Sequence, residues 1–139
     1  CYMKINEALL DFLASLGVEA EISAGESREE ARGMLCFKSA GRHEVSVGGR
    51  KIIGSAQRRR GDVFLQHGSI LAGPRHLDLL DFLAGGDRDA LAAATTDLGT
   101  LLGRELGPAD LDELAGPLAE SFGRCFDLPI EWRGARPGA

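Results

Sequence analysis

A cysteine and a lysine stand fifteen positions apart (51 minus 36), separated by a predicted tight turn. Lys51 comes almost directly after Gly48-Gly49, a pair whose tolerance of positive backbone angles suits a two-residue hairpin turn. A lysine ammonium can stabilise the negative charge that develops on a carbonyl, thioester or phosphate oxygen. An ammonium beside a thiol also increases the thiolate fraction, and the thiolate is the attacking form. Cys36 and Lys51 are therefore the candidate catalytic pair for acyl transfer.

Small residues follow the lysine and predict a slot for a ligand. Gly54, Ser55 and Ala56 have almost no side-chain bulk, so a ligand can lie close against the backbone there. Regular strand alternation places Lys51, Ile53 and Ser55 on one face of the strand. The residue types alone thus predict a basic hairpin with a binding slot beside its lysine.

These residues also have structural interpretations, which the residue types leave open. Cys36 suits a buried position as a small apolar residue, Lys51 suits a solvated one, and His67 suits a hydrogen-bonded place in a strand. The three histidines have no metal-ligand spacing with one another or with a cysteine. We therefore expect no metal site.

Charge is distributed unevenly along the chain. The formal net charge is -5, which argues against general nucleic-acid binding. Residues 38–60 nevertheless carry seven basic residues against one acid, Glu44, which gives +6 and leaves -11 (-5 minus 6) for the remainder. Such a segment suits an anionic partner or substrate. Its arginine run, Arg58, Arg59 and Arg60, is either a solvated turn or a partner-docking site.

Length and composition are those of one globular domain. The chain has 139 residues, 44% of them hydrophobic and 27% charged, which excludes disordered and fibrous classes. No run approaches the ~20 apolar residues of a membrane span, and no signal-peptide pattern opens the chain. The three cysteines are widely spaced and form no Cys-x-x-Cys pair, so we interpret them as thiols. These observations predict a cytoplasmic protein.

Hydrophobic periodicity predicts helices at both ends of the chain and strands between them. Apolar residues at helical spacing begin at Tyr2 and end at Leu16, before Gly17. Short helices are expected around 77–83, after an Asp87 cap and after a Thr96 cap, and a longer helix opens at Asp110. Alternating residues predict the strands Val18–Ser23, Glu44–Val47, Lys51–Ala56 and Val63–Leu71, with a further edge strand at Ile130–Trp132.

These elements combine into an α+β fold. The expected architecture is a twisted, mostly antiparallel sheet with helices packed on it, because consecutive short strands with tight turns form a meander. Pro117 lies within the last helix, where its ring removes one hydrogen bond, and we expect a kink there.

Two segments resemble a known superfamily. Gly49-Arg-Lys-Ile-Ile-Gly-Ser-Ala-Gln, together with Leu65-Gln-His-Gly-Ser-Ile-Leu, is similar to the lysine segment of the lipoate and biotin protein ligases. Within this superfamily, Cys36-Phe ahead of Glu44 and Lys51 resembles the cysteine-dependent octanoyltransferases of lipoate synthesis. The resemblance implies that Cys36 accepts the acyl group and that Lys51 polarises its carbonyl. It also implies the substrate-binding set Gly54, Ser55, Ala56, His67 and Gly68.

The implied reaction moves an octanoyl group from acyl carrier protein to a lysine of a lipoyl-dependent protein, such as the glycine cleavage H protein. It needs no cofactor, nucleic acid or membrane. One alternative is an ATP-dependent lipoate ligase, which would use ATP and Mg, with the same lysine and an incidental cysteine. Another is a non-catalytic half that docks a partner chain.

The chain departs from the family pattern in ways that affect its domain organisation. Ser39-Ala-Gly-Arg-His-Glu44 stands where those transferases tend to have Ser-Pro-Ser-x-Tyr-Glu. The family's Arg-Arg-x-x-Gly-Gly-x-x-Val-x-His signature, which walls the acyl pocket, is absent, and the resemblance places it before position 1. We therefore expect residues 1–133 to be the C-terminal part of a catalytic domain and 134–139 a disordered tail. The N-terminal half would be truncated or supplied by another chain.

Overall fold

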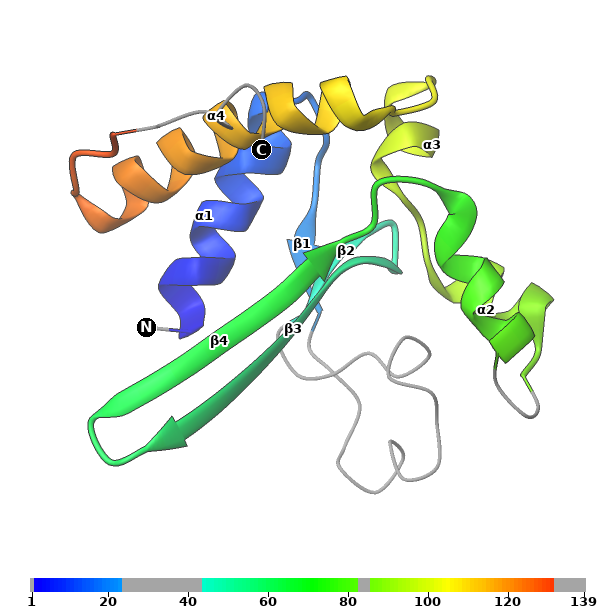
Figure 1. Ribbon diagram of the computed structural model, residues 1–139, viewed down its shortest axis with the longest axis horizontal. Coiled ribbons are helices and arrows are strands. Elements are labelled where there is room, and N and C mark those ends of the chain that lie inside the picture. Colours follow the sequence, from blue (N-terminus) through cyan, green and yellow to red (C-terminus); the bar gives the residue numbers. More distant parts are fainter. Residues whose placement is uncertain (1, 24–43, 83–85, 132–139) are drawn as a thin grey trace.

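The computed structural model describes residues 2–23, 44–82 and 86–131, which form an open antiparallel sheet with helices packed on it (Figure 1). Within these ranges four strands pair in chain order: β1 (Glu21–Ile22), β2 (Val45–Val47), β3 (Arg50–Arg60) and β4 (Val63–Ile70). All three pairings are antiparallel, so the α+β prediction is confirmed. The predicted tail 134–139 lies outside the described residues.

The meander follows the glycines that the sequence places at its turns. Gly48 and Gly49 have φ values of 55° and 74°, which residues with a Cβ rarely adopt, and they join β2 to β3 as predicted. The return strand is longer than expected because it continues through the arginine run to Gly61, which turns with φ 60°. We call the outer part of this hairpin, residues 57–66, the arm.

Among the described residues, five helical segments complete the fold. They are α1 (Tyr2–Ser15), the 3₁₀ segment η1 (Pro74–Phe82), α2 (Arg88–Ala94), α3 (Leu98–Leu102) and α4 (Pro108–Phe126). In Figure 1, α1 and α4 cross each other beside the sheet, whereas η1 and α2 lie at its other end. None of the described helices combines the length and apolar character that crossing a bilayer takes.

The core lies between α1 and the central strands. Buried Leu9, Phe12 and Leu13 of α1 pack with Ile52 and Ile53 of β3 in one cluster. Val18 also belongs to this cluster, and its amide donates to the Leu13 carbonyl at 3.0 Å. The expected strand 18–23 therefore shrinks to β1, because its first residues close the helix instead of pairing.

An ion pair joins α1 to α4. The Arg124 guanidinium donates to the Asp11 carboxylate at 2.7 Å, and both side chains are partly exposed. The hydrogen bond from Arg124, followed by one from Ser121, lowers the pKa of Asp11 below the ordinary 3.8. The two terminal helices thus face the sheet as one pair.

The residues that cap the helices agree only in part with the prediction. Asp87 caps α2 as expected, by accepting from the Ala90 amide at 3.0 Å. Helix α3 is capped by Asp97 and not by Thr96, since the Asp97 carboxylate accepts from the Thr100 amide at 2.9 Å. Asp110 lies inside α4, where its carboxylate accepts from the Gly107 amide at 2.8 Å. A carboxylate can reach back to an open amide from the third helical position, which the sequence pattern alone does not distinguish from a cap.

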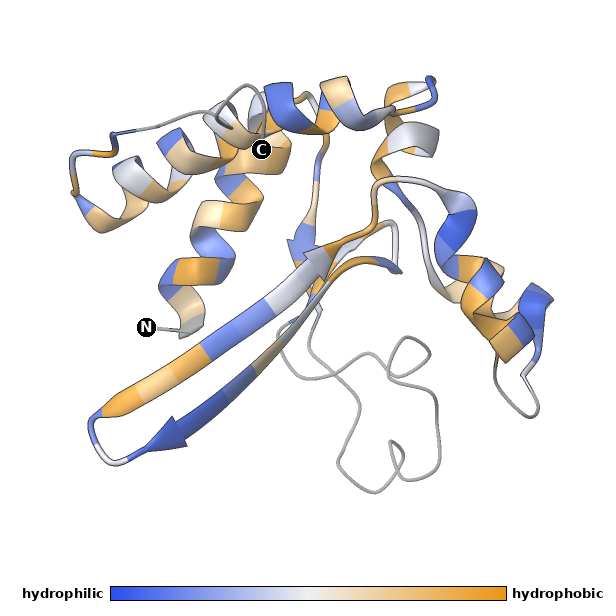
Figure 2. Ribbon diagram, in the orientation of Figure 1, coloured by the Kyte–Doolittle hydropathy of each residue, from blue (hydrophilic) through white to orange (hydrophobic). Residues whose placement is uncertain are grey.

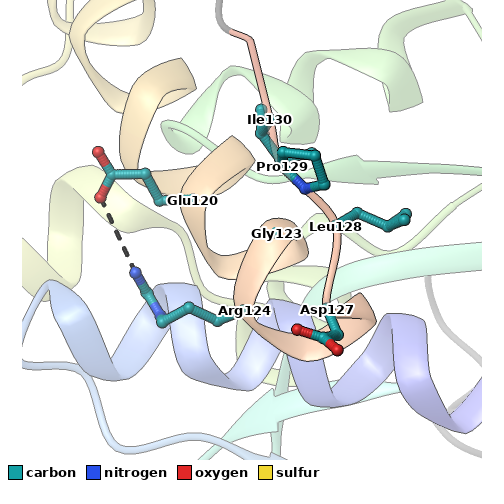
Figure 3. Close-up of a pocket in the computed structure, with 7 residues that line it drawn as sticks. All are labelled: Glu120, Gly123, Arg124, Asp127, Leu128, Pro129 and Ile130. Carbon is teal, nitrogen blue, oxygen red and sulfur yellow. Dashed lines mark ion pairs between the residues drawn. The ribbon is translucent and has the colours of Figure 1, made fainter.

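One prediction for the C-terminal half is confirmed and another, the edge strand at Ile130–Trp132, is wrong. The short helix expected around 77–83 is present as the 3₁₀ segment η1, which begins earlier, at Pro74. After α4, residues 127–131 form no strand, because the Leu128 amide bonds the Gly123 carbonyl at 3.1 Å and the chain folds back over the helix. Figure 3 shows Ile130 over the Gly123 turn, where a Cβ on the glycine would lie 2.8 Å from Ile130 Cγ1. Ile130 therefore packs on α4 instead of pairing with the sheet. At Pro117, α4 continues as one helix.

Candidate functional site

A cavity of about 290 Å³ lies over the inner part of the β3–β4 hairpin. It is lined by Glu44, Lys51, Gly54, Ser55, Ala56, His67, Gly68 and Ser69. The structure thus brings together the lysine and all five substrate-binding candidates of the sequence, whose roles remain predictions. Cys36 and His43 lie outside the described residues. The three arginines stand on the arm and do not line the cavity.

A bulge in β3 decides which way the lysine points. Ser46 of β2 pairs with Lys51, but the next pair joins Val45 to Ile53, so Ile52 is an extra residue. Ile53 faces the helices, where it lines a second, largely apolar cavity with Leu118 of α4. The Lys51 side chain lies instead on the opposite face, beside Gly54. The expectation that Lys51 and Ile53 share a face is therefore wrong, because the bulge interrupts the alternation.

The backbone around Lys51 is held from two sides. One side pairs with β2, and on the other the Thr96 amide donates to the Lys51 carbonyl at 2.9 Å. The next carbonyl, of Ile52, accepts from the Leu71 amide at 3.0 Å. Segments far apart in the sequence therefore fix the lysine's position.

Lys51 forms a buried ion pair with Glu44. Its Nζ donates to Glu44 Oε1 at 2.7 Å, and the two side chains are only 7% and 9% exposed. The sequence analysis counted Glu44 as the one acid of the basic segment but did not place it in the site. Glu44 is the one acid of this basic segment and directly precedes β2, and that position was the signal that could have identified it. Buried charges require partners, so a lysine predicted in a slot implied an acid nearby.

Two glycines make the cavity possible. A Cβ on Gly54 would lie 3.2 Å from Lys51 Cε, so the lysine occupies the space of the absent side chain. Gly68 pairs with Ser55 across the hairpin, and a Cβ there would lie 2.5 Å from the Gly54 carbonyl oxygen. Gly54 thus leaves room for the lysine side chain, and Gly68 allows the two hairpin backbones to approach closely.

Substituting Gly68 by alanine is expected to destabilise the hairpin. The added methyl must displace the β3 backbone, and overpacking of this kind costs about 1–3 kcal/mol. Gly73→Ala is the matched control, because a Cβ at Gly73 meets nothing within 4 Å. Urea unfolding followed by circular dichroism measures both free energies. Equal midpoints for the two variants would contradict the close approach.

Another histidine, His76, has a partner at each ring nitrogen. His76 contacts the Gly73 carbonyl through Nδ1 and Thr95 Oγ1 through Nε2, at 3.0 and 2.8 Å. Cys125 is a half-buried free thiol on α4. Within the part of the chain that the structure describes, no three His, Cys, Asp or Glu side chains are grouped to hold a metal.

The lysine-bearing face continues outward along the arm. Alternate residues share a face, so Gly54, Ala56, Arg58 and Arg60 lie on one side, and Arg59 lies on the other. Arg58 pairs with Leu65 and Arg60 with Val63, both strongly exposed at 67% and 73%. Figure 2 shows the same contrast, with a hydrophilic β3 end beside a hydrophobic start of β4. The face next to the cavity thus combines two cations with exposed apolar side chains.

Comparison with known proteins identifies the family. The family described as "Lipoyl protein ligase A/B catalytic domain" matches residues 1–122. The chain belongs to this family. Its resemblance to the lipoate and biotin protein ligases is therefore confirmed.

Within the lipoyl protein ligase A/B family, similar curated proteins carry the name Octanoyltransferase LipM. The protein of Symbiobacterium thermophilum is 37% identical over 93% of this chain and 50% of its own length. That of Carboxydothermus hydrogenoformans is 47% identical over 50% of this chain and 26% of its own length. A solved structure, lipoate-protein ligase A bound with ATP, matches 98% of this chain and 49% of its own with a TM-score of 0.67. At 19% identity this likeness shows the fold alone. The chain thus spans about half the length of the Symbiobacterium thermophilum protein.

Proposed function

We propose that this chain forms the lysine-bearing part of an octanoyltransferase. The enzyme would move an octanoyl group from acyl carrier protein to a lysine of a lipoyl-dependent protein, such as the glycine cleavage H protein. One observation carries the proposal: the buried Lys51 ammonium lies in a cavity lined by small residues. The names of the curated relatives support the same reaction.

The proposed chemistry has two steps. The Cys36 thiolate attacks the thioester carbonyl carbon, and the carrier's sulfur leaves with the electron pair of the broken carbon–sulfur bond. An acceptor amine then attacks the new thioester, and the Cys36 sulfur leaves in turn. Lys51 Nζ donates to the carbonyl oxygen as negative charge develops there in both steps. No cofactor is required, since the thioester itself supplies the free energy for amide formation.

Gly54, Ser55, Ala56, His67 and Gly68 would bind the acyl donor in this scheme. Arg58 and Arg60, on the lysine-bearing side of the arm, would dock the acidic carrier or acceptor. We place the reaction in the cytoplasm, with no role for nucleic acid or membrane. The rest of the catalytic domain would be joined to this chain or supplied in trans.

A covalent octanoyl-enzyme tests the proposal. This chain, with the N-terminal half of the catalytic domain fused ahead of it or added separately, is incubated with octanoyl carrier protein. Intact mass spectrometry should show one octanoyl adduct that hydroxylamine removes. Cys36→Ser should abolish the adduct, whereas Cys125→Ser should retain it. Labelling that persists in Cys36→Ser would contradict the assignment.

The same experiment separates the two alternatives. An ATP-dependent lipoate ligase would form an acyl-adenylate with ATP and Mg and would leave no adduct on the protein. A non-catalytic half would leave the transfer activity of the N-terminal portion unchanged when it is added. The small-residue cavity with its buried lysine favours a catalytic part.

A further inference from the structure

The two oxygens of the Glu44 carboxylate have different surroundings. Oε1 accepts from Lys51 Nζ at 2.7 Å. Oε2 is also buried, but it has no hydrogen-bond partner among the described residues. The side chain is only 9% exposed, and Glu44 lines the cavity that holds the lysine. One oxygen of a buried carboxylate that lines this cavity therefore has hydrogen-bonding capacity that the described residues leave unused.

An unpartnered buried oxygen is costly in a folded protein. Such an oxygen loses its hydration and gains no hydrogen bond in return. The ion pair with Lys51 uses only Oε1, so it does not explain why Oε2 is also buried. A substrate group that donates a proton would satisfy it.

The proposed reaction brings such a donor to this place. A lysine side chain has an ordinary pKa of about 10.4, so at pH 7 roughly one in 10³ is neutral. The acceptor lysine must be neutral to attack, and its nitrogen must lose another proton as the amide forms. A carbonyl oxygen bound to Nζ lies about 3 Å from it. The amine that attacks this carbonyl therefore arrives beside the carboxylate that shares the same ammonium.

We propose that Glu44 Oε2 is the proton acceptor for the attacking lysine. This inference rests on the octanoyltransferase function proposed above. The neutral amine forms a nitrogen–carbon bond to the octanoyl carbonyl, and the proton that it loses passes to Oε2. The carbon–sulfur bond breaks, and sulfur leaves with the electron pair as the thiolate of Cys36. Glu44 then returns the proton to water, which restores the carboxylate.

His67 is the competing base. Among the described residues that line the cavity, Glu44, Lys51 and His67 are the titratable ones. Lys51 is the carboxylate's cationic partner and donates to the carbonyl in the proposed reaction, so it does not act as the base. His67 stands on β4 and is exposed, whereas Glu44 is directly bonded to the group that would hold the carbonyl. The geometry therefore favours Glu44.

Glu44→Gln separates the base from the ion-pair partner. The amide Oε1 can still accept from Lys51, but the side chain no longer takes up a proton. The assay uses this chain with the rest of the catalytic domain and first isolates the octanoyl-enzyme. That intermediate is then mixed with glycine cleavage H protein or with hydroxylamine, a less basic nucleophile that is already largely neutral at pH 7 and depends far less on a protein base. Intact mass spectrometry follows both losses.

We expect transfer to the protein lysine to fall about 10²- to 10⁴-fold in Glu44→Gln, the usual contribution of a general base. Release by hydroxylamine should keep its wild-type rate, since the carbonyl is still held by Lys51. His67→Asn should not show this split between the two acceptors. An equal loss with both acceptors, or a wild-type transfer rate, would overturn the role of Glu44.

Glu44→Asp covers the case in which Glu44→Gln does not fold or does not acylate. It keeps the negative charge beside Lys51 but moves the carboxylate back by one methylene. We expect it to form the octanoyl-enzyme and to lose transfer to lysine selectively, while wild-type transfer would overturn the proposal. Absence of an octanoyl-enzyme in the wild type would instead refute the proposed function.

Discussion

Substituting Lys51 by methionine is expected to lower the free energy of unfolding by about 3–5 kcal/mol. The reason is that Glu44 would keep a buried negative charge after losing the ammonium that lies 2.7 Å from it. Surface pairs such as Arg75 with Asp78, which are largely exposed, contribute far less. Urea unfolding of the chain, followed by circular dichroism, measures the difference.

The double variant Lys51→Met with Glu44→Gln is the control for this result. Removing both charges together avoids the unpaired carboxylate, so most of the lost stability should return. Octanoyl transfer by the complete domain should be about 10²- to 10³-fold slower than in the wild type for both variants, since no ammonium remains to hold the oxyanion. Additive stability losses would show that the two charges do not depend on each other.

Reversing the charge of Arg58 and Arg60 is expected to lower kcat/KM for octanoyl carrier protein about 10- to 100-fold at low salt. Both arginines lie on the cavity side of the arm, where a docked acidic protein would reach Lys51. Salt should lower the wild-type rate strongly and the Arg58→Glu/Arg60→Glu rate much less, because screening removes the same attraction.

A variant of equal net charge separates docking from overall charge. Arg59→Glu with Arg75→Glu changes the charge by the same amount, but Arg59 lies on the opposite face of the arm and Arg75 stands on η1. Its kcat/KM should fall less than that of the cavity-side variant. Equal losses would mean that overall charge, and not this face, guides the carrier.

The sequence predicts those parts of the structure that neighbouring residues determine. Gly48-Gly49 needs only its own backbone freedom to form a turn, so the hairpin and the small-residue slot of residues 54–56 could be foreseen. The direction of Lys51 could not, because the bulge at Ile52 arises from pairing with β2. Alternation read along one strand gives the wrong face as soon as an extra residue is inserted.

Long-range contacts explain the other differences. Glu44 becomes a site residue only when the turn folds it back onto Lys51. Ile130 does not form the predicted edge strand, because the absence of a side chain at Gly123 lets it pack on α4. The cap at Asp97 and the place of Asp110 inside α4 depend on side-chain geometry within one turn, which residue type alone does not fix. The role of Cys36 remains a prediction, since it lies outside the described residues.

Strand β4 lies last in the sheet order, so hydrogen exchange along it can report whether another polypeptide binds its outer edge. Within residues 2–23, 44–82 and 86–131 no strand pairs along its outer side. In an antiparallel pair only every second residue bonds its neighbour, so amides bound to β3 should alternate with amides that face outward. Deuterium uptake along β4 should therefore alternate between slow and fast. Slowing of the fast set would reveal any polypeptide that joins the sheet at this edge.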